Sequence, residues 1–300
     1  MTAVTDPART RLAARTRPRP PVAMVAARAA INGLARIAPP LSGRAALLLW
    51  RRPAGQLPVR TAERAVMEQA RVSSVSQADR DVVTYEWGDG VHPVLLVHGW
   101  GSRGSRYAAV VARLLEAGYS PVTYDAPGHG ATLGRVGSIL DHQQIMQALE
   151  RRHGRFAGMV AHSLGVPLAL YAAREGVAVD RVVAVSGVCE FGYLVDSFCA
   201  TLQLHPAVNA HLRRAIERAY FDGDPGIWSR FSADRPADCY LLVVHDLADD
   251  VVDPHQAELL AGAYGTRATR MQTKGLRHNA ILRNTDVIRS MVAFLDEAPT

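Results

Sequence analysis

Hydrophobic and polar positions alternate with two different periods from about residue 82 to the end of the chain. Short apolar runs predict buried strands, and they alternate with stretches whose apolar positions recur at helical spacing. The predicted strands lie near residues 82–87, 93–98, 121–125, 157–162, 181–186, 239–245 and 267–273. The predicted helices lie at 104–117, 138–152, 163–175, 254–263 and 284–296. This alternation is typical of an α/β fold, with a mostly parallel central sheet and helices on both faces.

One interval interrupts this alternation. Between Gly187 and Asp238 the pattern predicts two or three short helices in place of the next strand. Seven of the nineteen aromatic residues fall within 41 positions of this interval: Phe191, Tyr193, Phe198, Tyr220, Phe221, Trp228 and Phe231. We expect residues 189–237 to form a small helical lid. The aromatic side chains either roof an apolar pocket or only pack the lid onto the core, which is the commoner use of aromatic residues.

The first sixty residues differ from the rest in charge. They contain eleven arginines and one acid, Asp6, a net charge of +10, whereas the remaining 240 residues carry −4 and the whole chain +6. A mildly acidic body without a nucleic-acid-binding motif argues against a nucleic-acid partner. Residues 1–60 are therefore interpreted as a basic extension, with a disordered start and then a helical stretch up to Pro39-Pro40. We expect this stretch to pack against the core, and contact with anionic membrane lipid or a targeting role are the alternatives.

Length and cysteine content limit the organisation further. A chain of 300 residues with 48% hydrophobic content can bury one sizeable core, which we place at residues 61–188 and 238–300 on either side of the insertion. Three cysteines without a C-x-x-C pair cannot form a complete disulfide framework, so a cytoplasmic location is expected. Arginines interrupt the apolar stretch between Val22 and Trp50, which argues against a membrane-spanning helix there.

A serine occupies the most informative position for chemistry. Ser163 lies between the predicted strand 157–162 and the helix that follows it, in the sequence Ala-His-Ser-Leu-Gly. A serine on such a sharp strand-to-helix turn is typical of a nucleophile elbow, which needs small residues two positions before and after it. Ala161 and Gly165 meet that need. The pattern therefore predicts that Ser163 is a nucleophile.

An acid and then a histidine follow the last two predicted strands. Asp249 lies in the acid-rich loop after strand 239–245, and His278 lies in the loop after strand 267–273. A serine hydroxyl needs an imidazole to remove its proton, and the imidazole needs a carboxylate to fix its tautomer. We therefore predict a triad of Ser163, Asp249 and His278, with Asp250 as the alternative acid.

A glycine turn after strand 93–98 supplies the remaining requirement of acyl transfer. Two backbone N–H groups must point at the developing oxyanion, and those of Trp100 and Leu164 are the candidates. The neighbouring His98 is expected to orient its turn by hydrogen bonding rather than to act as the base, and His129 and His162 are interpreted as a turn residue and a constrained neighbour of the elbow. The eleven histidines form no metal-binding motif and no dinucleotide-binding glycine pattern follows a strand, so neither a metal nor a cofactor is expected.

Five motifs in this order resemble those of the α/β-hydrolase superfamily over roughly residues 72–298. They are HGWG at 98–101, DAPGHG at 125–130, AHSLG at 161–165, HDLAD at 245–249 and GLRH at 275–278. The likeness is greatest to lid-bearing bacterial esterase-like members. In the family pattern the acid stands four residues after the strand-ending position, which His245 occupies here, and this count favours Asp249 over Asp250.

The resemblance implies an α/β-hydrolase fold and acyl chemistry, because the elbow carries serine where dehalogenases and epoxide hydrolases of this fold carry aspartate. The implied activity is hydrolysis of a carboxylic ester or thioester of a small apolar substrate through an acyl-serine intermediate. An acyltransferase or cyclase with the same triad is one alternative. A non-catalytic member that binds a ligand is the other.

Overall fold

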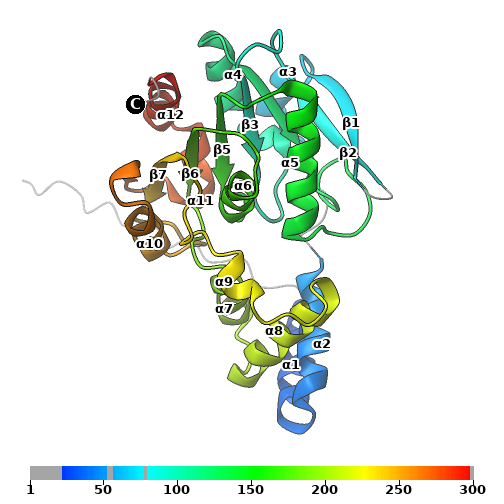
Figure 1. The fold of residues 1–300 in the computed structure, drawn as a ribbon. Coiled ribbons are helices and arrows are strands. Elements are labelled where there is room, and N and C mark those ends of the chain that lie inside the picture. Colours follow the sequence, from blue (N-terminus) through cyan, green and yellow to red (C-terminus); the bar gives the residue numbers. More distant parts are fainter. Residues whose placement is uncertain (1–21, 53–56, 78–79, 298–300) are drawn as a thin grey trace, which may run out of the picture.

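The computed structural model describes residues 22–52, 57–77 and 80–297, so the arginine-rich start that we expected to be disordered lies outside the described residues. An eight-stranded sheet in the order β1-β2-β4-β3-β5-β6-β7-β8 forms the centre (Figure 1). Its strands are β1 (Arg71–Gln77), β2 (Arg80–Glu86), β3 (Pro93–Val97), β4 (Ser120–Tyr124), β5 (Gly158–His162), β6 (Arg181–Val185), β7 (Tyr240–Asp246) and β8 (Ala268–Thr273). β2 pairs antiparallel with β1 and β4, and all other pairs are parallel.

Helices cover both faces of this sheet, as the alternating pattern predicts. One face carries α4 (Ala108–Glu116) and α12 (Thr285–Asp296), and the other carries α5 (Ile139–His153), α6 (Gly165–Arg174) and α10 (His255–Tyr264). Strand β3 shows why two layers form: Val94 and Leu96 join the apolar cluster on the first of these faces, whereas Leu95 and Val97 join the cluster on the second. Short elements complete the core: α3 (Thr61–Met67), α11 (Arg277–Ala280) and the 3-10 turns Gly104–Tyr107, Gly265–Arg267 and Ile281–Arg283.

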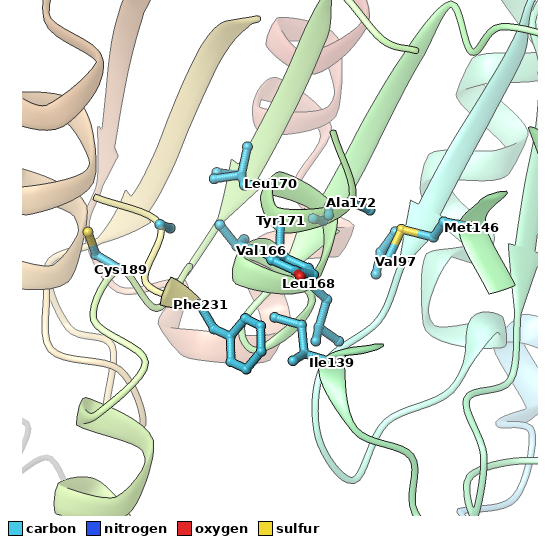
Figure 2. Close-up of a cluster of buried hydrophobic side chains, with 14 of the residues drawn as sticks. Val97, Ile139, Met146, Val166, Leu168, Leu170, Tyr171, Ala172, Cys189 and Phe231 are labelled. Atoms are coloured by element: carbon cyan, nitrogen blue, oxygen red, sulfur yellow. The ribbon is translucent and has the colours of Figure 1, made fainter. Parts of the chain in front are cut away.

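The helix α6 lies deep in the second cluster. Figure 2 shows side chains of α6, among them Leu168 and Tyr171, packed between Met146 of α5 and Phe231 of the insertion. The Tyr171 and Phe231 rings meet edge to face with centroids 4.9 Å apart. Because α6 is buried on so many sides, the turn that begins it has a fixed position.

The insertion between β6 and β7 and the N-terminal segment form a separate helical layer. The insertion contains α7 (Tyr193–Thr201), α8 (Pro206–Tyr220) and α9 (Ile227–Arg230), and α1 (Val22–Ile37) and α2 (Pro39–Trp50) lie beside α8, away from the sheet (Figure 1). The N-terminal helices therefore pack mainly on the insertion, where we had expected the core. The helical stretch also continues past Pro39, because proline is tolerated in the first turn of a new helix.

Across the described ranges, no helix combines the length and the apolar character that crossing a membrane would require.

Candidate active site

The turn between β5 and α6 has the strained geometry predicted for an elbow. Ser163 has a φ of +57°, in the left-handed region that non-glycine residues rarely adopt. A Cβ at Gly165 would lie 2.2 Å from the carbonyl oxygen of Val97, so only glycine fits there. Ala161 is fully buried within β5. The requirement for small residues on both sides of Ser163 is therefore visible as close packing.

The loops after β7 and β8 bring Asp249 and His278 together. The Nδ1 atom of His278 donates a hydrogen bond to Oδ2 of Asp249 at 2.9 Å, and both side chains are almost fully buried. The Oδ1 atom of Asp249 accepts hydrogen bonds from the backbone N–H groups of Val251 and Val252. Burial alone would raise the pKa of Asp249, but the hydrogen bonds from His278 and the backbone outweigh it and lower the pKa. Asp249 is thus held ionised against the imidazole.

The neighbouring acid, Asp250, has different surroundings. Its carboxylate is about half exposed and lies 3.8 Å from the guanidinium of Arg277. Asp253, the next acid along the loop, accepts a hydrogen bond from the backbone N–H of His255 at the start of α10. Of these three acids, Asp249 is the one that contacts His278.

Two residues near the triad candidates have supporting contacts that the sequence did not predict. Asp246, fully buried at the end of β7, accepts hydrogen bonds from Thr273 and from the backbone N–H groups of Gly275 and Leu276. It therefore anchors the loop that carries His278. Burial would raise the pKa of Asp246, but the hydrogen bonds from Thr273 and the backbone lower it to about 2.

The second such residue is His245, also in β7. Its Nε2 atom donates to the carbonyl of Val252 at 3.1 Å and lies 3.5 Å from Oδ2 of Asp249. The ring therefore lies beside Oδ2 of this carboxylate, whereas the backbone donors contact its Oδ1. A histidine four residues before the acid is the only sequence signal for this contact.

The glycine turn after β3 presses directly against the elbow. A Cβ at Gly99 would lie 2.8 Å from Cβ of Ser163 and 3.3 Å from the backbone nitrogen of Leu164. The contact brings the segment that carries Trp100 next to the start of α6, where Leu164 is the N-terminal capping residue. The two backbone donors expected for an oxyanion hole are therefore on adjoining turns.

Three histidines around the site hold loops together. His98 donates from Nδ1 to the carbonyl of Gly99 and accepts from the backbone N–H of Ala126, and burial lowers its pKa to about 4. His129 accepts from the backbone N–H of Gly101.

The third, His162, donates from Nε2 to the carbonyl of His278, and burial lowers its pKa to about 3. The neutral ring links the end of β5 to the loop of His278. The contacts of His98 are of the turn-orienting kind expected for it.

Ser163 and His278 border a single cavity of about 940 Å³. Six of the seven aromatic residues of the insertion line it, namely Phe191, Tyr193, Phe198, Tyr220, Phe221 and Trp228. Phe231 is buried against Tyr171 instead and fastens the insertion to the core. Six of these aromatic residues thus line the cavity, as one alternative predicts, and Phe231 packs the insertion onto the core, as the other predicts. Within the described part of the chain, no group of three or more His, Cys, Asp or Glu side chains is arranged to hold a metal ion.

Comparisons with known proteins agree with this architecture. Residues 94–288 match the profile of a family described as "Alpha/beta hydrolase family". No curated protein sequence matches the chain significantly. Similar solved structures include an esterase from Pyrococcus furiosus (TM-score 0.62, 14% identity, 82% of this chain and 96% of that one). An esterase from a Rhodococcus species is also similar (TM-score 0.56, 17% identity, 77% of this chain and 100% of that one). So is a monoacylglycerol lipase from Paleococcus ferrophilus (TM-score 0.54, 22% identity, 71% of this chain and 98% of that one). At these identities the likeness concerns the fold.

Proposed function

Because this chain belongs to the alpha/beta hydrolase family, we propose that it is a serine hydrolase that cleaves a carboxylic ester or thioester of an apolar substrate through an acyl-serine intermediate. The observation that carries the proposal is the pair of His278 and Asp249, hydrogen-bonded at 2.9 Å, on the wall of the cavity that Ser163 also borders. The similar structures include two esterases and a monoacylglycerol lipase, which points to the same reaction class.

The cycle assigns one role to each of these groups. Asp249 occupies Nδ1 of His278, which leaves Nε2 to take the proton from the Ser163 hydroxyl as its oxygen attacks the carbonyl carbon. The imidazolium then gives this proton to the leaving alcohol or thiol, and the acyl group remains on Ser163. Nε2 of His278 then takes a proton from a water molecule, whose oxygen attacks the acyl-serine. As the acid leaves, the imidazolium gives this proton to the serine oxygen.

Two backbone groups complete the proposed site. The N–H groups of Trp100 and Leu164 stabilise the negative charge that develops on the carbonyl oxygen in both tetrahedral intermediates. Their support comes from the contact of Gly99 with Ser163 and Leu164, which fixes one turn against the other. Such fixed donors contribute about 10²–10³ each to the rate in other acyl-transfer sites.

The test compares the wild-type protein with Ser163→Ala in the hydrolysis of p-nitrophenyl esters from acetate to octanoate. Removal of the hydroxyl should abolish ester hydrolysis. The thermal unfolding temperature should stay close to that of the wild type, because alanine fits the elbow. The matched control is Ser186→Ala, which also changes a serine with positive φ at the end of a neighbouring strand. Wild-type turnover in Ser163→Ala would reject the proposal.

A further inference from the structure

The N-terminal helices are joined to the insertion by specific polar contacts. Arg28 of α1 donates to Oε1 of Gln203 at 2.5 Å, and Asn32 donates to the carbonyl of the same residue. The Oδ1 atom of Asn32 accepts from the backbone N–H of His205 at 2.7 Å. These bonds attach α1 to the turn between α7 and α8.

The contact between α2 and α8 is closer still. A Cβ at Gly43 would lie 2.4 Å from the carbonyl carbon of His211, so the two helix backbones touch at this point. Ala46 and Leu47 are buried in the interface, and Arg51 donates to the Tyr220 hydroxyl at 3.1 Å. The two N-terminal helices and α8 therefore form one closely packed layer.

This layer contributes directly to the cavity that holds Ser163. Ala23, Met24 and Ala27 of α1 line it, as does Trp50 at the end of α2. The Trp50 ring lies edge to face with Phe198 of the insertion, at 5.2 Å between centroids. All four residues precede residue 94, where the match to the family begins. The wall they form thus lies outside the part of the chain that matches the family.

The size of the cavity changes one sequence-based expectation, the small substrate. A volume of about 940 Å³ is near the upper end of the range of about 300–1,000 Å³ for small-molecule sites. Apolar and aromatic side chains dominate its lining, and they extend from the insertion to α1. A flexible apolar group of considerable length would use this space, whereas an acetyl group would leave most of it unfilled.

We propose that α1 and α2 form the far wall of the acyl-binding site, that this site takes an extended acyl chain, and that the small side chain of Ala27 leaves room for the distal end of that chain. The proposal rests on the proposed function, because Ser163 must be the residue that is acylated. It assigns a role in substrate selection to a segment that lies in sequence far from the triad candidates.

The experiment places a bulky side chain in the proposed far wall. Ala27→Trp is compared with Ala26→Trp, because Ala26 is the adjacent residue of α1, is exposed and does not line the cavity. Ala23→Trp is a second variant at an exposed lining position, in case Ala27→Trp disturbs the packing of α1. Each protein is assayed for kcat/KM with p-nitrophenyl acetate, butanoate, hexanoate and octanoate, and thermal unfolding reports whether it is folded.

In the wild type we expect kcat/KM to rise by up to about fourfold for each added methylene, the fold-change that corresponds to burial of one such group. Ala27→Trp and Ala23→Trp should lower the value for octanoate by about tenfold or more and leave that for acetate within about twofold, because only the distal part of the chain meets the new ring. Ala26→Trp should match the wild type with every ester.

Two results would overturn the inference: an unchanged octanoate-to-acetate ratio in both folded cavity variants, or a wild type that hydrolyses acetate as well as octanoate. Failure of the proposed function has another signature, since no ester would then be hydrolysed in a Ser163-dependent manner.

Discussion

Gly99 offers a direct way to test whether the glycine turn after β3 and the elbow act together. A Cβ at this position would lie 2.8 Å from Cβ of Ser163, 2.9 Å from the carbonyl oxygen of His162 and 3.3 Å from the backbone nitrogen of Leu164. None of these atoms is the end of a flexible side chain. The φ of Gly99 is not positive, so alanine is allowed by the backbone, and Gly99→Ala acts through this contact alone.

The magnitude follows from the two consequences of separating the turns. Overpacking of a closely packed region costs about 1–3 kcal/mol, which we expect as a decrease in the free energy of unfolding. Misplacing one oxyanion donor lowers kcat by about 10²–10³. This loss is smaller than the free energy of unfolding of a typical domain, so the variant should remain folded at room temperature. Its kcat should nevertheless fall by at least about 10².

The assay measures kcat on p-nitrophenyl butanoate and the free energy of unfolding in urea. Gly262→Ala is the control, since Gly262 lies in α10, does not line the cavity, and a Cβ added there would meet no atom within 4 Å. It should keep wild-type kcat and gain up to about 1 kcal/mol of stability. A folded Gly99→Ala variant with wild-type kcat would refute the reasoning, because the turn could then move without affecting the chemistry.

Three further predictions concern the acids and the N-terminus. Asp249→Asn should lower kcat by about 10⁴, as loss of the triad carboxylate does elsewhere, whereas Asp250→Asn should have little effect, and reversed effects would assign the acid to Asp250. The pKa of Asp246, lowered to about 2 when folded, should give the wild type stability above about pH 4 that is lost as the pH falls through about 2. When the free energy of unfolding is measured in urea at a series of pH values, Asp246→Asn should lack about 2 kcal/mol of this pH dependence. The same change of unfolding free energy with pH in both proteins would contradict the role of the carboxylate. Deletion of residues 1–20 should leave ester hydrolysis unchanged, whereas deletion of residues 1–60 should destabilise the protein because it removes α1 and α2. If the shorter deletion variant folded but lost activity, the arginine-rich start would have a function of its own.

Much of the fold could be predicted because its central strands β3, β4, β5 and β6 are buried along their whole length. The seven strands expected from apolar runs all occur, each within two residues of the predicted bounds. One strand, β1, was missed: it lies at the edge of the sheet, only Val75 and Gln77 of its residues are buried, and its sequence contains no apolar run. The strand at the opposite edge, β8, has no buried residue, although it was predicted.

The candidate site was visible in the sequence to the extent that it is local. Ser163, Asp249 and His278 each follow a strand, and a parallel sheet brings the carboxyl ends of its strands to one edge. The support given by Asp246 depends on contacts with the loop after β8, and no local pattern reports it. The contact of His245 with Asp249 is local, but its only signal in the sequence is the four-residue spacing. The packing of α2 on α8 depends likewise on two segments more than 150 residues apart.

The central claim is that Ser163 is the nucleophile, and covalent labelling tests it most directly. The full-length protein is incubated with a fluorophosphonate, and the modified peptide is located by mass spectrometry. We predict one adduct per chain, on Ser163, with no adduct on the Ser163→Ala variant and greatly slowed labelling of His278→Ala. An adduct on a different residue, or labelling of Ser163→Ala at the wild-type rate, would contradict the account.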